Sequence, residues 1–401
     1  MMPRPIYLDH HATTPLDPAV LEAMMPYLTD KFGNASSRLH RYGWEAEEAV
    51  LTAREQVAAL IHAKPDEIIF TSGATESDNL ALKGIARAYR HKGNHIITAT
   101  TEHKAILDTC KALEADGFEV TYVPVDRLGL VDPDDVRKAI TPRTILISIM
   151  YANSEIGTIA PLATIGTIAR EHGVLFHSDA VQGIGKIACD VNALQVDLLS
   201  LSGHKIYGPK GIGALYIRTT RPRRIRLQPL IDGGGQERGL RSGTLNVPSI
   251  VGLGKACELC QQLWPEESVR LQTLRQRLYE GLCQRLDEMF LNGHAEQRLP
   301  GNLNVSFAYV QSESLLMVLK DIVALSAGAA CASGSHEPSY VLRAIGVDDT
   351  LASASIRFGL GRTTTAEEID TVIDAVATKV ERLRALAPVH DLRQARIVST
   401  P

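Results

Sequence analysis

Short apolar runs alternate with longer stretches of helical periodicity through the first half of the chain. The runs are rich in Ile, Val and Leu, which is typical of buried strands, and they lie at residues 68–70, 95–98, 119–123, 145–149, 174–176 and 197–201. Between several of them, apolar positions recur at helical spacing over residues 76–89, 103–115 and 162–171. Strands that alternate with helices in this way predict an α/β fold with a mostly parallel sheet covered by helices.

The pattern changes after Pro248. A long helical stretch runs from about Ser249 to Arg285, and it is followed by a strand-like run at 304–307 and a last helix at 366–386. The segment from Arg4 to Pro15 is expected to cross to this later part of the chain. We therefore predict a large domain of residues 16–255 and a smaller, discontinuous α+β domain of residues 1–15 and 256–401.

Composition narrows the class of protein. The 401 residues carry a net charge of −4, which gives no overall electrostatic reason to expect nucleic acid or anionic lipid as a partner. The N-terminus has no signal-peptide core, and the strongest apolar run, 144–150, is too short to span a bilayer. The six cysteines are dispersed rather than densely spaced, so we expect them to be reduced and the protein to be cytoplasmic.

Two sequence segments place polar groups directly after predicted strands. Residues 71–77 combine the end of a strand with a Gly-containing turn and a helix start, where backbone N–H groups favour an anion such as phosphate. An ordinary helix cap is the alternative reading. Asp179 follows the strand that ends near Phe176, at the edge where open α/β sheets bind ligands. It is suited to pair with a cationic ring nitrogen, or else to cap a helix.

A third segment adds an amine. Lys205 follows a strand and a small-residue stretch, and glycines between 208 and 213 allow the backbone to pack closely. A partly desolvated lysine there is suited to form a Schiff base, although a lone lysine is usually a solvated surface charge. Together the three segments suit one ligand that carries a phosphate, an aromatic ring with a nitrogen and a carbonyl. Pyridoxal 5′-phosphate is such a ligand.

At this point the chain resembles a known family, the cysteine desulfurases of the IscS/NifS type within the class V aminotransferases. The segments that carry the resemblance are residues 7–9, 12–15, 32–34, 71–77, 101–104, 202–205 and 238–244. It extends from Pro5 to about Pro388. The resemblance implies the pyridoxal-phosphate fold type I, which is the fold of aspartate aminotransferase.

The resemblance also implies roles for individual residues. Lys205 would form the Schiff base with pyridoxal phosphate, Asp179 would hold the pyridinium proton, and His103 would stack on the ring and shuttle protons. Gln182 and the residue at 154 would contact the ring's phenolic oxygen. The phosphate would be held by Ala74, Thr75, Ser202 and His204, and by Thr244 of a neighbouring subunit in a homodimer, and Gly203 would also belong to the cofactor site. Arg357 would bind the substrate carboxylate as a bidentate fork.

Cys331 is the residue that would define the reaction. It lies in a run rich in Gly, Ala and Ser, which suits a thiol that enters a site and leaves with sulfur. The resemblance implies that L-cysteine is converted to L-alanine, with a persulfide left on Cys331. The sulfur would then pass to an acceptor such as an iron–sulfur cluster scaffold, with transient iron–sulfur ligation by Cys331 and no resident metal.

Some positions depart from the family or allow other readings. Ser154 stands where the family usually has an Asn that contacts the cofactor. Either Ser154 acts through a bridging water, Asn153 adapts, or the electronics of the cofactor ring are tuned differently in this protein. The C-terminal tail, which in the family helps to dock the scaffold, is shortened. His10 and His11 are expected near the entrance of the site, and Cys257 and Cys260 are expected in the core rather than at a metal.

Two rival functions remain open from the sequence. A selenocysteine lyase or related aminotransferase would use Lys205, Asp179 and His103 without needing Cys331. A non-catalytic partner subunit would keep the fold but would not convert a substrate.

Overall fold

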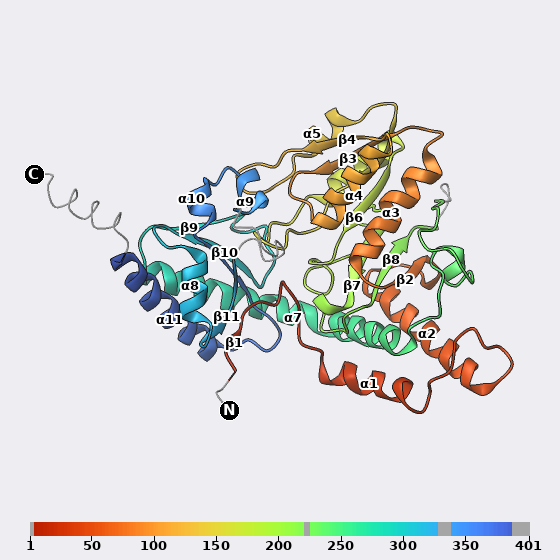
Figure 1. Ribbon diagram of the computed structural model, residues 1–401, viewed down its shortest axis with the longest axis horizontal. Coiled ribbons are helices and arrows are strands. Elements are labelled where there is room, and N and C mark those ends of the chain that lie inside the picture. Colours follow the sequence, from red (N-terminus) through yellow and green to blue (C-terminus); the bar gives the residue numbers. More distant parts are fainter. Residues whose placement is uncertain (1–3, 220–224, 328–337, 387–401) are drawn as a thin grey trace, which may run out of the picture.

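A seven-stranded sheet forms the centre of the larger part of the molecule in the computed structural model, which describes residues 4–219, 225–327 and 338–386 (Figure 1). In spatial order the strands are β2 (Ile68–Thr71), β8 (Gly213–Ile217), β7 (Leu198–Ser202), β6 (Leu175–Asp179), β5 (Thr144–Ser148), β3 (His95–Ala99) and β4 (Glu119–Val123). β8 runs antiparallel to both of its neighbours, and the other adjacent strands pair in parallel. The mostly parallel sheet predicted from the alternating pattern is therefore confirmed.

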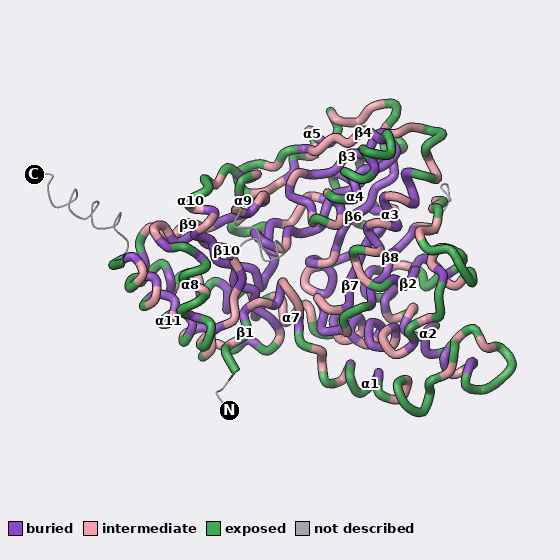
Figure 2. The backbone as a smooth tube through the Cα atoms, in the orientation of Figure 1, coloured by how far each residue is buried: buried purple, intermediate pink, exposed green. Residues whose placement is uncertain are grey.

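Helices cover both faces of this sheet. α3 (Ala74–Tyr89) and α4 (Lys104–Ala115) pack on one face, and α2 (Arg41–Leu60), α6 (Leu162–His172) and the first half of α7 (Val247–Arg285) pack on the other. Successive residues of β2 show the two-residue period, since Ile68 and Phe70 join the α2 side and Ile69 joins the α3 side. The strands other than β4 are buried almost throughout, which explains the continuous apolar runs of the sequence. β4, at the edge of the sheet, is mostly of intermediate exposure. Figure 2 shows the buried strands in purple at the centre of the larger part of the molecule.

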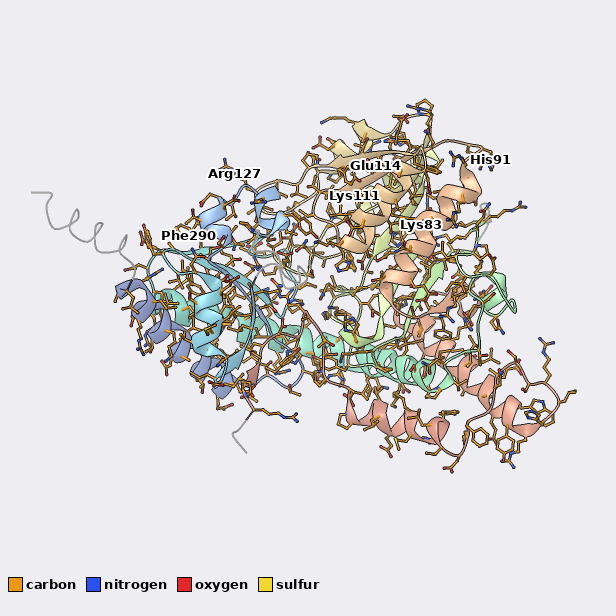
Figure 3. The ribbon with its side chains drawn as sticks, in the orientation of Figure 1. Lys83, His91, Lys111, Glu114, Arg127 and Phe290 are labelled. Carbon is orange, nitrogen blue, oxygen red and sulfur yellow. The ribbon has the colours of Figure 1, made fainter. Side chains whose placement is uncertain are left out.

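The covering helices are amphipathic. In α4 the residues Ile106, Cys110 and Leu113 are buried, while Lys111 and Glu114 project from the exposed face (Figure 3). This three-to-four residue spacing is the helical signal read from the sequence. The remaining helices of this part are α1 (Pro18–Leu28), which packs along α7, and α5 (Pro133–Ala139), which contacts α6.

A second core lies at the other end of the molecule. Its four-stranded sheet has the order β12 (Ser326–Ala327), β13 (Ser355–Gly359), β10 (Asn302–Phe307) and β9 (Met289–Leu291), and the short β1 (Ile6–Tyr7) pairs in parallel with β11 (Val323–Ala324). The helices of this part are α8 (Ser312–Leu319), α9 (Tyr340–Ala344), α10 (Asp349–Ala352) and α11 (Ala366–Ala385). α7 joins the two cores, because its residues up to Cys260 belong to the first and those from Leu271 belong to the second (Figure 1).

Within the described ranges, no helix is both long enough and apolar enough to cross a membrane.

Candidate active site

The carboxyl ends of five parallel strands open into one cavity of about 590 Å³. Parallel strands end at the same edge of a sheet, so the segments that follow β2, β3, β5, β6 and β7 meet there. The predicted site residues that line this cavity are Ala74, Thr75, His103, Ser154, Asp179, Gln182, Ser202, His204, Lys205 and Arg357. Its size suits a small cofactor with a bound substrate.

The first turn of α3 supplies an anion site at one end of the cavity. Ala74 and Thr75 begin the helix directly after Gly73, whose φ of +152° is a conformation that favours glycine. Gly213 of β8 packs against this turn, since a Cβ on it would lie 2.8 Å from the Gly73 Cα. Backbone N–H groups at the positive end of a 16-residue helix are suited to hold a phosphate.

Asp179 provides the buried acid. It is the last residue of β6, and its Oδ1 accepts a hydrogen bond of 3.0 Å from the Val181 N–H. Burial raises the pKa of the Asp179 carboxyl, and the nearby His103 and Lys205 act in the opposite direction. A cationic ring nitrogen placed against this carboxyl would stabilise its ionised form.

Lys205 lies at the end of the short helical turn Gly203–Lys205 that follows β7. Its Nζ donates hydrogen bonds of 2.6 Å to the backbone oxygens of His11 and Ala12, so the N-terminal segment closes one side of the site. Gly203 is buried beneath this turn, where a Cβ would lie 2.9 Å from the Pro209 oxygen. It shapes the loop without lining the cavity.

His204 is held beside the same turn. Its Nδ1 lies 3.1 Å from the Thr13 Oγ1, and burial together with nearby lysines lowers the pKa of its imidazole to about 4. His204 is therefore neutral at physiological pH.

His103 is oriented by its own helix. It is the N-cap of α4, and its Nδ1 accepts a hydrogen bond of 3.1 Å from the Ala105 N–H. Because Nδ1 acts as an acceptor there, the ring proton of the neutral imidazole is on Nε2. A proton relayed by this residue would move through Nε2.

Arg357 comes from the second core and reaches the cavity from β13. Its Nη2 donates to Asp9 Oδ1 at 2.9 Å and its Nη1 donates to the Ser154 oxygen at 3.1 Å. Its Nε is buried and has no hydrogen-bond partner among the described residues. A buried donor without a partner is costly, and a bound carboxylate is the group that satisfies a guanidinium best.

Gln182 is held by contacts that the sequence did not reveal. Its Oε1 lies 3.0 Å from the His11 Nδ1 and 2.9 Å from the Lys186 Nζ, and its Nε2 donates to the His11 oxygen at 3.0 Å. The expectation that His10 and His11 lie at the entrance is wrong, because each is 2% exposed and His11 lines the cavity. The contacts between Gln182 and His11 join residues 171 positions apart and leave no local signal.

The contacts of Asn153 show whether it can replace the asparagine that the family usually has at the position of Ser154. The Asn153 side chain donates to the Thr101 oxygen at 3.0 Å and accepts from the N–H groups of Glu155 and Ile156 at 2.8 and 3.0 Å. Asn153 therefore holds its own turn and does not line the cavity. Ser154 lines it with a short hydroxyl, which leaves a bridging water as the remaining way to reach a ring oxygen.

Two predicted site residues do not line this cavity in the described part of the chain. Thr244 is exposed and lies outside it. Cys331 lies outside the described residues. The described flanks of its segment reach the site, since Ser326 pairs with Arg357 between β12 and β13, and Ser339 donates to Glu155 Oε2 at 2.5 Å.

Among the other cysteines, Cys110, Cys189, Cys257 and Cys260 are buried, and Cys283 is exposed. Cys257 and Cys260 are 0% and 1% exposed in the first core, which confirms the core assignment made from the sequence. Burial raises the pKa of the Cys260 thiol to about 11. The described ranges contain no group of three or more His, Cys, Asp or Glu side chains suited to bind a metal ion.

The fold and the cavity define a class of protein. An amine, a buried acid, an imidazole, an amide and a helix N-terminus converge at the carboxyl edge of a mostly parallel sheet. These groups match the aldehyde, ring nitrogen, ring face, phenolic oxygen and phosphate of pyridoxal phosphate, so the residues fit that cofactor. The class is that of pyridoxal-phosphate enzymes with the type I fold.

Comparison with known proteins gives the family. Residues 6–372 match the model of the aminotransferase class-V family. The cysteine desulfurase IscS of Anaeromyxobacter dehalogenans (strain 2CP-C) is 59% identical over 388 residues, which cover 97% of this chain and 95% of that protein. The chain therefore belongs to the aminotransferase class-V family, whose cofactor is pyridoxal phosphate.

Solved structures agree with this assignment. A NifS-like protein superposes with a TM-score of 0.87 at 40% identity, covering 94% of this chain and 99% of that one. A structure described as SspA in complex with cysteine has a TM-score of 0.78 at 41% identity, covering 88% of this chain and 98% of that one. The predicted fold type, family and cofactor are confirmed.

Proposed function

We propose that this protein is a cysteine desulfurase that converts L-cysteine to L-alanine and retains the sulfur as a persulfide on Cys331. The observation that carries the proposal is the single cavity in which Lys205, Asp179 and His103 meet Arg357. The names of the relatives support it, since they include a cysteine desulfurase and a protein solved with cysteine.

Arg357 would bind the substrate and set its orientation. Its Nε, which has no hydrogen-bond partner among the described residues, and its Nη2 lie on one edge of the guanidinium, and that edge is suited to a bidentate carboxylate. Asp9 and the Ser154 oxygen hold the guanidinium in place, so the substrate meets a preorganised group.

Pyridoxal phosphate, when bound, supplies an electron sink for the substrate amino acid. Asp179 would hold the proton on the ring nitrogen, and Gln182 would donate to the ring oxygen. Lys205 would provide the amine that receives the cofactor, and it would accept and return a proton at Nζ. His103 would exchange protons at Nε2.

Cys331 would take the sulfur. Its thiolate attacks the sulfur of the substrate, an S–S bond forms and the C–S bond breaks. The electron pair of the C–S bond stays with carbon, which takes up a proton to give alanine. The sum is L-cysteine plus enzyme thiol giving L-alanine plus enzyme persulfide. The position of the described flanks, one paired with Arg357 and one bonded to Glu155, supports Cys331 as the thiol that enters the site.

The proposal includes assembly and partners. We propose a homodimer in which Thr244 reaches the phosphate of the neighbouring subunit, and the exposure of Thr244 outside its own cavity supports this. The proposed acceptor is an iron–sulfur cluster scaffold protein in the cytoplasm. The division into residues 16–255 and residues 1–15 with 256–401 stays a prediction, which the two separate cores support.

Alanine and sulfide release from L-cysteine tests the proposal. Purified protein with and without a thiol reductant is compared with Cys331→Ala and Lys205→Ala. We expect the wild type to form alanine and both variants to lose this activity. Turnover that survives Cys331→Ala would favour a selenocysteine lyase or aminotransferase, and a colourless, inert wild type would favour a non-catalytic subunit.

A further inference from the structure

Lys186 lies behind the candidate active site and has no part in the proposed reaction. It follows Gln182 by four residues, and its Nζ donates a hydrogen bond of 2.9 Å to the Gln182 Oε1. On its other side is a separate cavity of about 20 Å³, which Lys186 lines together with His10 and Trp264. Lys186 thus joins this small cavity to Gln182, which lines the candidate active site.

The contacts of Gln182 fix which way its amide points. The oxygen accepts from the Lys186 Nζ and from the His11 Nδ1, and the nitrogen donates to the His11 backbone oxygen. A flipped amide would set its NH₂ against the Lys186 amine and its oxygen against a carbonyl oxygen. The contacts therefore permit one orientation, in which one N–H of Nε2 is used and the second is available to a ligand.

The surroundings of Lys186 disfavour the charged form of its amine. Lys186 has no ion-pair partner within the described ranges, and burial together with Lys205 and Arg357 lowers its pKa to about 7, against the opposing effect of Cys260. The other titratable groups around it are His10, His11, Glu267 and Tyr207. A lysine Nζ carries N–H donors whether charged or neutral, so the bond to Gln182 is available in both forms.

The geometry points to Lys186 as a positioning residue that fixes the Gln182 amide with its free N–H turned toward the ring oxygen of pyridoxal phosphate. The inference deepens the proposed function and rests on it, because the cofactor's ring oxygen is the acceptor. His11 assists by holding the same amide at both of its ends.

The absorbance of the bound cofactor tests this role without relying on turnover. In Lys186→Met the Gln182 amide loses one of the three contacts that orient it and keeps the two to His11. The amide is then held less firmly toward the ring oxygen, which loses donor strength and holds its proton more tightly. We expect the pH at which the cofactor's absorbance changes to rise by about one unit. We expect the retention of pyridoxal phosphate to weaken by about tenfold.

A double variant shows whether Lys186 acts through Gln182. In the Gln182→Leu background, Lys186→Met should add less than half of the shift that it causes alone, because the amide to be oriented is gone. Lys186→Arg, which keeps a donor, should recover part of the wild-type pH profile. Lys255→Met is the control, since Lys255 is a partly exposed lysine that pairs with Glu258 at 2.7 Å and lines neither cavity.

The outcomes separate this inference from the proposed function. A yellow, active wild type whose absorbance profile is unchanged by Lys186→Met would overturn the positioning role alone. Equal shifts in both backgrounds would also overturn it, since they would indicate a direct effect of charge. A wild type that neither binds pyridoxal phosphate nor forms alanine would instead contradict the proposed function.

Discussion

At the residue scale, Arg357 shows how the second core contributes to a site built on the first. The side chain is 3% exposed and comes from β13, yet it reaches the cavity at the edge of the large sheet. Asp9 and the Ser154 oxygen each take one terminal nitrogen, and Nε is left without a partner in the described part of the chain. The guanidinium is thus held in place beside the cavity, as the proposed binding of a substrate carboxylate requires.

Replacing Arg357 by Lys tests whether the substrate carboxylate needs the planar guanidinium or only a positive charge. Lysine keeps the positive charge near Asp9 but cannot form two parallel bonds to a carboxylate. We expect kcat/KM for L-cysteine to fall by about 100-fold, mainly through a higher KM. Initial rates of alanine formation measure this effect.

Arg343→Lys serves as the control for Arg357→Lys. Arg343 pairs with Asp349 at 2.7 Å on the surface, and its side chain is 43% exposed. The substitution should leave the rate of alanine formation unchanged. A KM for Arg357→Lys equal to that of the wild type would show that Arg357 does not bind the carboxylate.

The site residues that the sequence revealed are those with a local signal. Asp179 ends the apolar strand β6 and Lys205 lies just beyond β7, and the topology of a parallel sheet brings such positions together. Lys186 and Glu155 were missed, and His11 was expected only at the entrance, because their roles depend on burial or on contacts between residues distant in sequence. No pattern within a short window records such contacts.

At the element scale, Glu155 links three elements beside the cavity. Its Oε2 accepts from Ser339, the N-cap of α9, and its backbone oxygen accepts from Asn302 and Asn304 of β10. Burial raises the pKa of Glu155 to about 7, although Ser339 and Arg357 act to lower it. The folded protein therefore favours the protonated form of this carboxyl.

This raised pKa predicts a pH-dependent stability. A carboxyl whose pKa is higher in the folded state contributes stability at low pH, and the contribution is lost as pH rises from about 4.5 through about 7. Relative to Glu155→Gln, which stays neutral, the wild type should lose roughly 2–3 kcal/mol of unfolding free energy between pH 5 and pH 8. Urea unfolding at both pH values measures the difference.

Glu266→Gln, on the exposed face of α7, is the control for this measurement and should follow the wild type. If Glu155→Gln and the wild type change in parallel with pH, Glu155 does not titrate in this range.

The elements themselves were predicted unevenly. The long helix from 249 to 285 corresponds to α7 (Val247–Arg285), and the last helix and the central strands were also found. α2 was missed because its buried face is largely Ala and Gly, which gives a weak hydrophobic signal. β8 was missed because it follows the glycine-rich stretch at 208–213, which reads as loop.

At the scale of the whole molecule, the proposal requires two subunits for each complete site. Thr244 is exposed and follows a loop that is anchored on its own subunit, where Arg241 pairs with Glu76 at 2.9 Å and Glu237 pairs with Arg54 at 2.6 Å. The anchored loop presents Thr244 outward. Losing one hydrogen bond to a phosphate should weaken cofactor retention in Thr244→Ala by about tenfold.

Mixed dimers decide whether Thr244 acts across the interface. One subunit carries Lys205→Ala and the other carries Thr244→Ala. If Thr244 acts in trans, the subunit that keeps Lys205 receives an intact Thr244 from its neighbour, so each mixed dimer holds one wild-type site. Tight retention of cofactor at that site is expected. If retention there is as weak as in the Thr244→Ala homodimer, Thr244 acts within its own subunit.

The central claim is that Cys331 receives the sulfur of L-cysteine. The most direct measurement is mass spectrometry of the peptide containing Cys331 after the protein reacts with one equivalent of L-cysteine in the absence of reductant. We predict a mass increase of one sulfur atom on Cys331, matched mole for mole by alanine. Alanine formed without any sulfur added to Cys331 would contradict the account.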